Sequence, residues 1–381
     1  MLTEETVFCQ PSWVMQSNAV RMAVTHIGGH MGPVNFDLAQ TPSVQPFHIS
    51  PWQCEDHSYL DGRSEAVLRG DLFCLPFGKA DPGDGTPSHG RTASALWSLG
   101  GHRSAGGVQE LSIHMENALH SAAVKREFYM RDGDNIIYDR TTISGLNGAY
   151  TMGHHAVLRV PAQEGGLLVS TSKQKFGMTF PRPFGDPAEA EYQSLAIHAE
   201  FTDLSSVPSF FRDVPNADCS RYPARRGFSD LLQIAVEAEK GKPAWSAAVN
   251  STEGYLWFSL RDPALLPSTV LWIENGGRHR PPWNGRNSSL GIEDVCAYFD
   301  TGSESSGAAN PFSERGIKTV QTFKSDVPVS VAYLQGAVRT PPGFTHVRSV
   351  RCEDSSVTLA DASGKEVSCS VRTGFVFGET L

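Results

Sequence analysis

The chain has 381 residues with 41 acidic side chains against 32 lysines and arginines, which gives a formal net charge of −9. A hydrophobic content of 40% can form a core and excludes a disordered protein. The acidic balance, without a basic stripe, argues against nucleic-acid binding. The 36 glycines and 24 prolines show no three-residue period, so they predict abundant turns and exclude a collagen.

The N-terminus and the cysteines predict a cytoplasmic protein. The first residues, MLTEETVFCQPSW, have neither the basic start nor the apolar stretch of a secretory signal. No run of about 18 apolar residues predicts a membrane span. The cysteine number is odd and no CxxC spacing occurs, a pattern typical of free thiols in a reducing compartment. The cysteines are Cys9, Cys54, Cys74, Cys219, Cys296, Cys352 and Cys369.

Short β-branched or aromatic runs bounded by turn residues recur along the chain and predict strands. They lie at 20–24, 156–160, 166–170, 255–260, 270–273, 329–334 and 347–351. The turn at 131–135 predicts a hairpin between 125–130 and 136–138. A second turn at 362–365 joins 357–359 to 367–371.

Helical patterns are rare. The best candidate is 230–240 (DLLQIAVEAEK), with Ser229 as N-cap and Gly241 just past its end, although the run LLQIAV also fits a strand. Two long loops, 76–90 and 301–314, have the length of functional loops. No linker and no repeat interrupts the series of strands, so we expect one all-β sandwich domain over 1–381.

Histidines mark two segments that could carry chemistry. His89 ends the first long loop and precedes Trp97, so it lies either in a cleft or in solvent. His154 and His155 are adjacent in a predicted strand and must face opposite sides of it. Only one of these two can face a given cleft, and a satisfied core histidine is the alternative for either.

The densest segment is 271–286, followed by the strand 290–295. It combines three arginines with His279, Trp272 and Trp283, and Glu293 follows between apolar neighbours. Apolar surroundings raise a carboxyl pKa, which suits an acid or base working near neutrality. Tryptophan faces are suitable for stacking on sugar rings. The alternative for Glu293 is a structural ion pair with a loop arginine, and Asp294 should point away from it.

The sequence gives less support to a metal site, to a nucleophilic serine and to nucleotide binding. His154 or His155 with His89 and Glu293 could ligate zinc, but no HxH or HExxH pattern is present. No GxSxG, GxGxxG or P-loop occurs either. We therefore predict neither a metal nor a cofactor.

Four segments, in this order, resemble the galactose-mutarotase-like superfamily, which includes the aldose 1-epimerases. They are Thr-His-Ile-Gly-Gly-His-Met at 25–31; Leu-Pro-Phe-Gly at 75–78 with His89-Gly90 and Trp97; Gly-His-His-Ala-Val-Leu at 153–158; and Leu-Gly-Ile-Glu-Asp at 290–294 with Tyr298, Phe299 and Gly302. The resemblance covers about 15–335. It implies a large antiparallel β-supersandwich, which strands at 345–378 would complete.

The resemblance also implies a catalytic site. Glu293 would be the base, His155 the acid, and His89 a hydrogen-bonding partner near the ring oxygen of a sugar. We expect the substrate-binding residues to be Lys79, Asp230, Arg278, His279, Trp283 and Arg286. The sequence departs from the family where Ala93 and Ser94 replace the Arg and Asn that usually follow the first His-Gly, and the Asn-His-x-Tyr-Phe-Asn-Leu form of the second histidine motif is absent.

The expected ligand is a small sugar. Three arginines within nine residues suggest that it carries an anionic group. A non-catalytic carbohydrate-binding protein, and a lyase or hydrolase on the same fold, are the alternatives to an epimerase. The sequence carries no signal for an oligomeric state.

Overall fold

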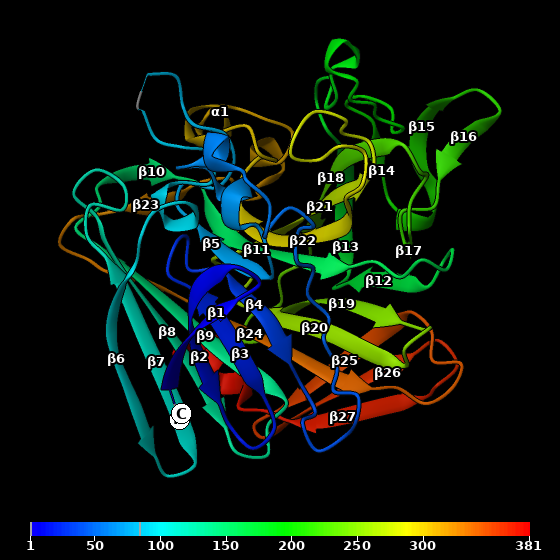
Figure 1. Ribbon diagram of the computed structural model, residues 1–381. Coiled ribbons are helices and arrows are strands. Elements are labelled where there is room, and N and C mark those ends of the chain that lie inside the picture. Colours follow the sequence, from blue (N-terminus) through cyan, green and yellow to red (C-terminus); the bar gives the residue numbers. More distant parts are fainter. Residues whose placement is uncertain (1, 84) are drawn as a thin grey trace.

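The computed structural model describes residues 2–83 and 85–381, which form mainly antiparallel β-strands (Figure 1). All seven predicted strand segments and both predicted hairpins are confirmed. The larger of the two main sheets has the order β1-β2-β3-β4-β5-β11-β22-β21-β18-β13-β14. Its strands are β1 Leu2–Val7, β2 Gln10–Gln16, β3 Arg21–Thr25, β4 Met31–Asn35, β5 Asp71–Cys74, β11 Met152–Arg159, β22 Ser288–Cys296, β21 Ser268–Asn275, β18 Phe228–Val236, β13 Gln174–Thr179 and β14 Glu200–Phe201.

The second main sheet has the order β17-β12-β19-β20-β24-β9-β8-β7-β6. Its strands are β17 Arg221–Tyr222, β12 Leu167–Thr171, β19 Ala244–Asn250, β20 Tyr255–Arg261, β24 Val329–Arg339, β9 Ile136–Ser144, β8 Ala123–Arg131, β7 Val108–Met115 and β6 Ser98–Ala105. Two small pairs join β10 Gly148–Tyr150 to β23 Gln321–Phe323 and β15 Val207–Phe211 to β16 Val214–Ala217.

Helical turns are short. The α-helix α1, Ser303–Gly307, lies in the segment 301–314 that we expected to be a loop. Single 3-10 turns occupy Ser58–Leu60, Ser64–Val67, Arg91–Ala93, Pro187–Glu189, Leu204–Ser206, Ser313–Arg315 and Thr373–Phe377. No helix of the described residues is long and apolar enough to cross a membrane.

Apolar side chains fill the space between the two main sheets and also cover their outer faces. On β21, Leu271 and Ile273 point between the sheets, whereas Trp272 points to the outer face. On β20, Trp257 points inward and Phe258 outward. Successive residues of a strand face opposite sides of the sheet. Because both sides are covered here, both sets of residues are apolar, and the sequence loses the alternation of apolar and polar residues that is typical of a half-buried strand.

This double burial explains why the segment 230–240 fits both a helix and a strand. The strand alternative is the correct one for 230–236, which belong to β18 and are all buried. A strand covered on both sides reads as a continuous apolar run, and periodicity alone does not separate such a run from a buried helix.

The C-terminal segment forms its own sheet of β25 Val347–Glu353, β26 Ser356–Asp361 and β27 Glu366–Ser370. It packs on the outer face of the second main sheet through a cluster that includes Phe258, Val357 and Phe375. In Figure 1 these strands lie beneath β19 and β20. The segment therefore adds a layer, whereas we expected it to complete the two large sheets.

Two of the cysteines are not free thiols. Cys9, in the turn between β1 and β2, forms a disulfide with Cys54, which is 45 residues further along the chain. Cys74, Cys219 and Cys296 are free and buried. The expectation of seven free thiols is therefore wrong for this pair, and the cysteines no longer argue for a reducing compartment.

We predict that the denatured, unreduced protein exposes five reactive thiols and that reduction raises the number to seven. A colorimetric thiol titration in denaturant measures both numbers. The double variant Cys9→Ser/Cys54→Ser should give five thiols before and after reduction. Seven reactive thiols in the unreduced wild type would contradict the disulfide.

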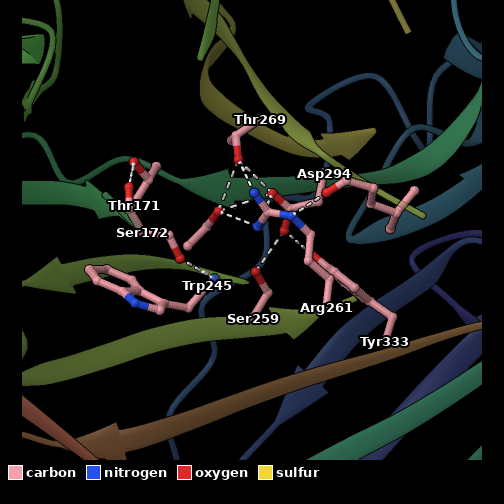
Figure 2. A network of polar contacts seen from close by, with 10 residues as sticks. Thr171, Ser172, Trp245, Ser259, Arg261, Thr269, Asp294 and Tyr333 are labelled. Carbon is pink, nitrogen blue, oxygen red and sulfur yellow. Dashed lines mark hydrogen bonds and ion pairs between the residues drawn. The ribbon is translucent and has the colours of Figure 1, made fainter. Parts of the chain in front are cut away.

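A buried network of polar contacts lies behind β22 (Figure 2). The Asp294 carboxylate accepts hydrogen bonds of 2.7–3.0 Å from the hydroxyl groups of Ser246, Ser259, Thr269 and Tyr333. The Arg261 guanidinium lies 2.7 Å from the same carboxylate, and both side chains are fully buried. Both oxygens of the Asp294 carboxylate are therefore fully hydrogen-bonded. A buried charge needs such partners, because its transfer from water is otherwise costly.

Removal of one partner should leave an uncompensated buried charge. We expect Arg261→Leu to lower the free energy of unfolding by about 3–5 kcal/mol, measured by urea denaturation. The matched control is Arg351→Leu, because Arg351 is exposed and its contacts with Glu353 and Glu366 are 3.7 Å long. That control should change stability by less than about 0.5 kcal/mol. Equal effects of the two substitutions would contradict this role of Arg261.

Candidate active site

The register of β11 with β22 brings the two main candidates together. His155 lies opposite Glu293, and His154 lies opposite Asp294. Because neighbouring residues of a strand face opposite sides, His155 and Glu293 share one face of the sheet. His154 and Asp294 share the other face, toward the buried networks.

His155 and Glu293 line a cavity of about 270 Å³ on the outer face of the larger sheet. Five further residues that the sequence analysis named also line it: His89, Lys79, Arg278, Trp272 and Trp283. Arg280, another of the three arginines noted in the sequence, also lines the cavity. The remaining polar walls come from residues that the sequence analysis did not single out, which are Ser64, Glu65, Ser88, Glu191 and Asp300.

The catalytic candidates lie in mutual contact. His155 Nε2 is 3.2 Å from Glu293 Oε1. The rings of His89 and His155 are nearly perpendicular, with centroids 5.2 Å apart, and Trp272 meets the His155 ring edge-on at 5.7 Å. The site is thus an acid–base pair enclosed by a second imidazole and aromatic walls.

Burial sets the protonation of the pair. It raises the pKa of Glu293 well above its usual value, and the Asp300 carboxylate acts in the same direction against the opposing charge of Arg278. Burial also lowers the pKa of His155 well below 6.5, and the charges of His89 and His30 add to this effect. Both shifts favour the uncharged forms, a carboxylic acid beside a neutral imidazole.

A glycine makes room for the carboxyl group. Gly291 is two residues before Glu293, so it lies on the same face of β22. A Cβ atom at position 291 would lie 2.6 Å from Glu293 Oε1 and 3.0 Å from the Cβ of Trp272. The observed position of the carboxyl group therefore depends on the absence of a side chain at 291.

Backbone contacts fix the half-buried His89. Its φ angle of 62° lies in the left-handed region, and its N–H donates to the carbonyl of Gly78 at 2.7 Å. The Gly78 N–H approaches His89 Nδ1 at 3.4 Å, so the neutral ring carries its proton on Nε2. Burial lowers the pKa of His89. Gly90 has no room for a side chain, because its Cβ would lie 1.9 Å from the Leu75 carbonyl.

Arg278 places a positive charge in the aromatic wall. Its Cζ atom lies 4.9 Å from the ring centre of Trp283, 5.7 Å from that of Trp272 and 5.2 Å from that of Phe184. Its Nε atom is 3.7 Å from the buried Glu274 carboxylate. Both tryptophans are themselves almost fully buried, so they form the walls of the cavity and are not open platforms.

Three predicted substrate-binding residues do not line this cavity. Asp230 is buried on the opposite face of β18, where its carboxylate accepts hydrogen bonds from Ser194 and Leu195. His279 packs against Tyr192, with ring centres 6.3 Å apart. Arg286 forms a two-pronged ion pair with Glu55 at 2.6 Å.

Each arginine of the 278–286 segment has a carboxylate partner. Arg278 lies near Glu274, Arg280 donates to Glu191 at 2.8 Å, and Arg286 pairs with Glu55. The positive charge that suggested an anionic ligand is therefore offset within the protein.

Asp300 is the main site residue that the sequence analysis missed. It follows Tyr298 and Phe299 in the segment that resembles the superfamily, seven residues after Glu293. Its Oδ1 atom is buried and has no hydrogen-bond partner. A Cβ atom on Gly78 would lie 2.7 Å from the Asp300 backbone, so the two loops touch directly.

Four of the described residues that line the cavity have a buried polar atom without a hydrogen-bond partner. These atoms are His155 Nδ1, Trp272 Nε1, Glu293 Oε1 and Asp300 Oδ1. Buried polar atoms in proteins are normally paired. A small ligand with several hydroxyl groups would supply the missing partners.

The only group with metal-ligand spacing within residues 2–83 and 85–381 is Asp71, Asp139 and His154. It lies on the far side of the sheet from this cavity. Arg126 already contacts both carboxylates, at 2.8 Å and 2.6 Å. Of the residues in the zinc alternative, His154 lies on the other face of the sheet. His155, His89 and Glu293 line the cavity, but they do not form a group with metal-ligand spacing among the described residues.

No protein-family model and no curated protein matches the chain. Several solved structures, however, match the chain. A galactose mutarotase-like protein from Clostridium acetobutylicum superposes with a TM-score of 0.59 at 12% identity, over 89% of this chain and 99% of that chain. The YeaD protein of Salmonella typhimurium gives 0.57 at 14% identity, over 89% and 94%. A galactose mutarotase related enzyme from Lactobacillus acidophilus gives 0.53 at 9% identity, over 86% and 98%.

The chain therefore has the galactose-mutarotase-like fold, a large antiparallel β-sandwich. The fold class expected from the sequence is confirmed. At these identities the likeness concerns the fold alone, so the chemistry has to be argued from the cavity.

The raised pKa of Glu293 predicts a pH-dependent gain in stability for Glu293→Gln. Above pH 4.5 the unfolded chain ionises this group while the folded protein keeps its proton, so wild-type stability falls as pH rises toward the folded pKa. Glutamine has no such loss. The stability of the variant relative to wild type should increase by up to about 1.4 kcal/mol per pH unit over this interval.

Urea denaturation at pH 5 and pH 8 measures this gain. The control is Glu314→Gln on an exposed turn, whose effect on stability should not change with pH. If the Glu293→Gln difference is the same at both pH values, the folded carboxyl group titrates normally.

Proposed function

We propose that the protein is an aldose 1-epimerase, which interconverts the anomers of a small sugar by opening and closing its ring. The observation that carries this proposal is the contact of 3.2 Å between His155 and Glu293 inside a cavity lined by polar and aromatic side chains. The volume of about 270 Å³ lies just below the range of about 300–1,000 Å³ that is usual for ligand pockets. It suits a monosaccharide or one terminal sugar unit.

Ring opening needs one proton removed and one proton added. Glu293 takes the proton of the anomeric hydroxyl group, a C=O double bond forms at C1, and the bond from C1 to the ring oxygen breaks. His155 then gives its proton to the ring oxygen. Rotation about the bond between C1 and C2, followed by the reverse proton transfers, closes the ring as the other anomer.

The pair carries a single proton through the whole cycle. Before opening, Glu293 is a carboxylate and His155 an imidazolium; after opening, Glu293 is protonated and His155 neutral. Burial favours the second distribution, which is the one that recloses an open chain. Hydroxyl groups of a bound sugar that donate to Glu293 favour the first distribution.

Neighbouring groups support this chemistry. The proton on His89 Nε2 can be donated to an oxygen of the sugar as negative charge develops on it. Arg278 lies near enough to oppose the pKa increase of Glu293. The carboxylate Asp300 and the ammonium of Lys79 remain available for hydroxyl groups. Because the arginines are paired, we propose an uncharged aldose as the substrate in this cavity.

The test is polarimetry on freshly dissolved α-anomers of common neutral aldoses. Wild type should accelerate the change in rotation, and Glu293→Gln should lower kcat about 10²–10⁴-fold because one proton-transfer group is removed. The rate should fall at low pH, where the pair gains a second proton, and at high pH, where it loses its only proton.

Glu314→Gln serves as the matched control and should retain wild-type activity, since it lies on an exposed turn. Saturable sugar binding without acceleration would instead identify a carbohydrate-binding protein. Equal rates for wild type and Glu293→Gln would exclude Glu293 as the base.

A further inference from the structure

A second and larger cavity, of about 990 Å³, lies on the opposite side of β18 and β21. Strand alternation separates the two cavities, because Leu231 and Trp272 line the first and Asp230 and Ile273 line the second. The hairpin β15–β16, which projects at the upper right of Figure 1, forms one wall. The loop 160–165 forms another.

Four arginines converge on this cavity from two distant segments. They are Arg221, Arg225, Arg226 and Arg286. Arg221 and Arg286 form exposed ion pairs with Asp218 and Glu55, which are weak in water.

Two of these arginines have no carboxylate partner in the described part of the chain. Arg225 lies over the ring of Phe211 at 4.1 Å and near that of Phe228 at 5.7 Å. Arg226 is exposed, and no ion pair is formed by either side chain among residues 2–83 and 85–381. Both guanidinium groups are therefore free to bind an anion.

The remaining lining mixes apolar side chains, such as Phe211 and Ile273, with neutral polar groups, and the carboxylates of Glu164 and Asp218 also belong to it. Side-chain amides and hydroxyls come from Asn216, Asn275, Asn287, Ser209 and Ser288. The acidic Asp230 is already satisfied by Ser194 and Leu195. Amides and hydroxyls beside guanidinium groups match a ligand that has many hydroxyl groups and also carries negative charge.

We propose that this cavity binds an acidic oligosaccharide, whose carboxylate or sulfate groups pair with Arg225 and Arg226. The cavity has more than three times the volume of the first one, which provides room for several sugar rings. The net charge of −9 repels a long polyanion such as nucleic acid, so the attraction is confined to this groove. The proposal stands independently of the reaction at Glu293.

The experiment is calorimetric titration with three tetrasaccharides: a carboxylated one built from galacturonic acid, a sulfated one of the chondroitin type, and neutral cellotetraose. At least one acidic probe should bind about tenfold or more tightly than cellotetraose, and its affinity should fall with salt. Preference for the galacturonic acid probe indicates carboxylate recognition, and preference for the chondroitin-type probe, which also carries carboxylates, indicates that sulfate groups add to binding. The double variant Arg225→Gln/Arg226→Gln should weaken its binding at least about tenfold.

Two controls separate this cavity from the first. Arg351→Gln removes an exposed arginine elsewhere, and Glu293→Gln alters the proposed catalytic pair; both should bind the acidic probe like wild type. Thermal unfolding should show that the double variant remains folded. Equal affinity for cellotetraose, equal affinity for inorganic sulfate, or unchanged binding by the double variant would each overturn the proposal.

Discussion

The antiparallel pairing of β11 with β22 determines both the proposed chemistry and the interior behind it. One residue pair, His155 and Glu293, faces the cavity, and the next pair, His154 and Asp294, faces the space between the sheets. A shift of register by one residue would exchange these faces. The hydrogen-bonded ladder is therefore the element on which the contact of 3.2 Å depends.

The two faces differ in how their carboxylates are paired. Behind the strands, Asp294 is matched by Arg261 and four hydroxyl groups, and Asp71 and Asp139 are matched by Arg126, although Asp71 Oδ1 has no hydrogen-bond partner among the described residues. Toward the cavity, Glu293 has no arginine or lysine in an ion pair within the described part of the chain, and polar atoms of His155 and Glu293 lack hydrogen-bond partners there. The network around Asp294 holds the strands in place, and this rigidity allows the groups on the other face to be presented to a ligand.

Much of the fold and part of the site could be predicted from the sequence, because strand runs and turn residues are local signals. Glu293 was identified because its apolar neighbours made a polar residue conspicuous, whereas His155 was identified through the resemblance of 153–158 to the superfamily's second histidine segment. The disulfide of Cys9 with Cys54, the position of Asp230 and the contribution of Asp300 depend on contacts between distant segments. The choice between helix and strand for β18 stayed open at the level of the sequence, because burial on both faces removes the period of two.

The glycine at position 291 has a consequence for efforts to stabilise the molecule. Glycine in a strand interior is less favourable than alanine by roughly 0.5–1 kcal/mol, so a selection for thermal stability alone would favour replacing it. The space it leaves is where the carboxyl group of Glu293 lies. An alanine at position 291 would therefore displace the carboxyl group of the proposed base. At this position, the requirement of the site for glycine opposes the preference of the strand for a residue with a side chain.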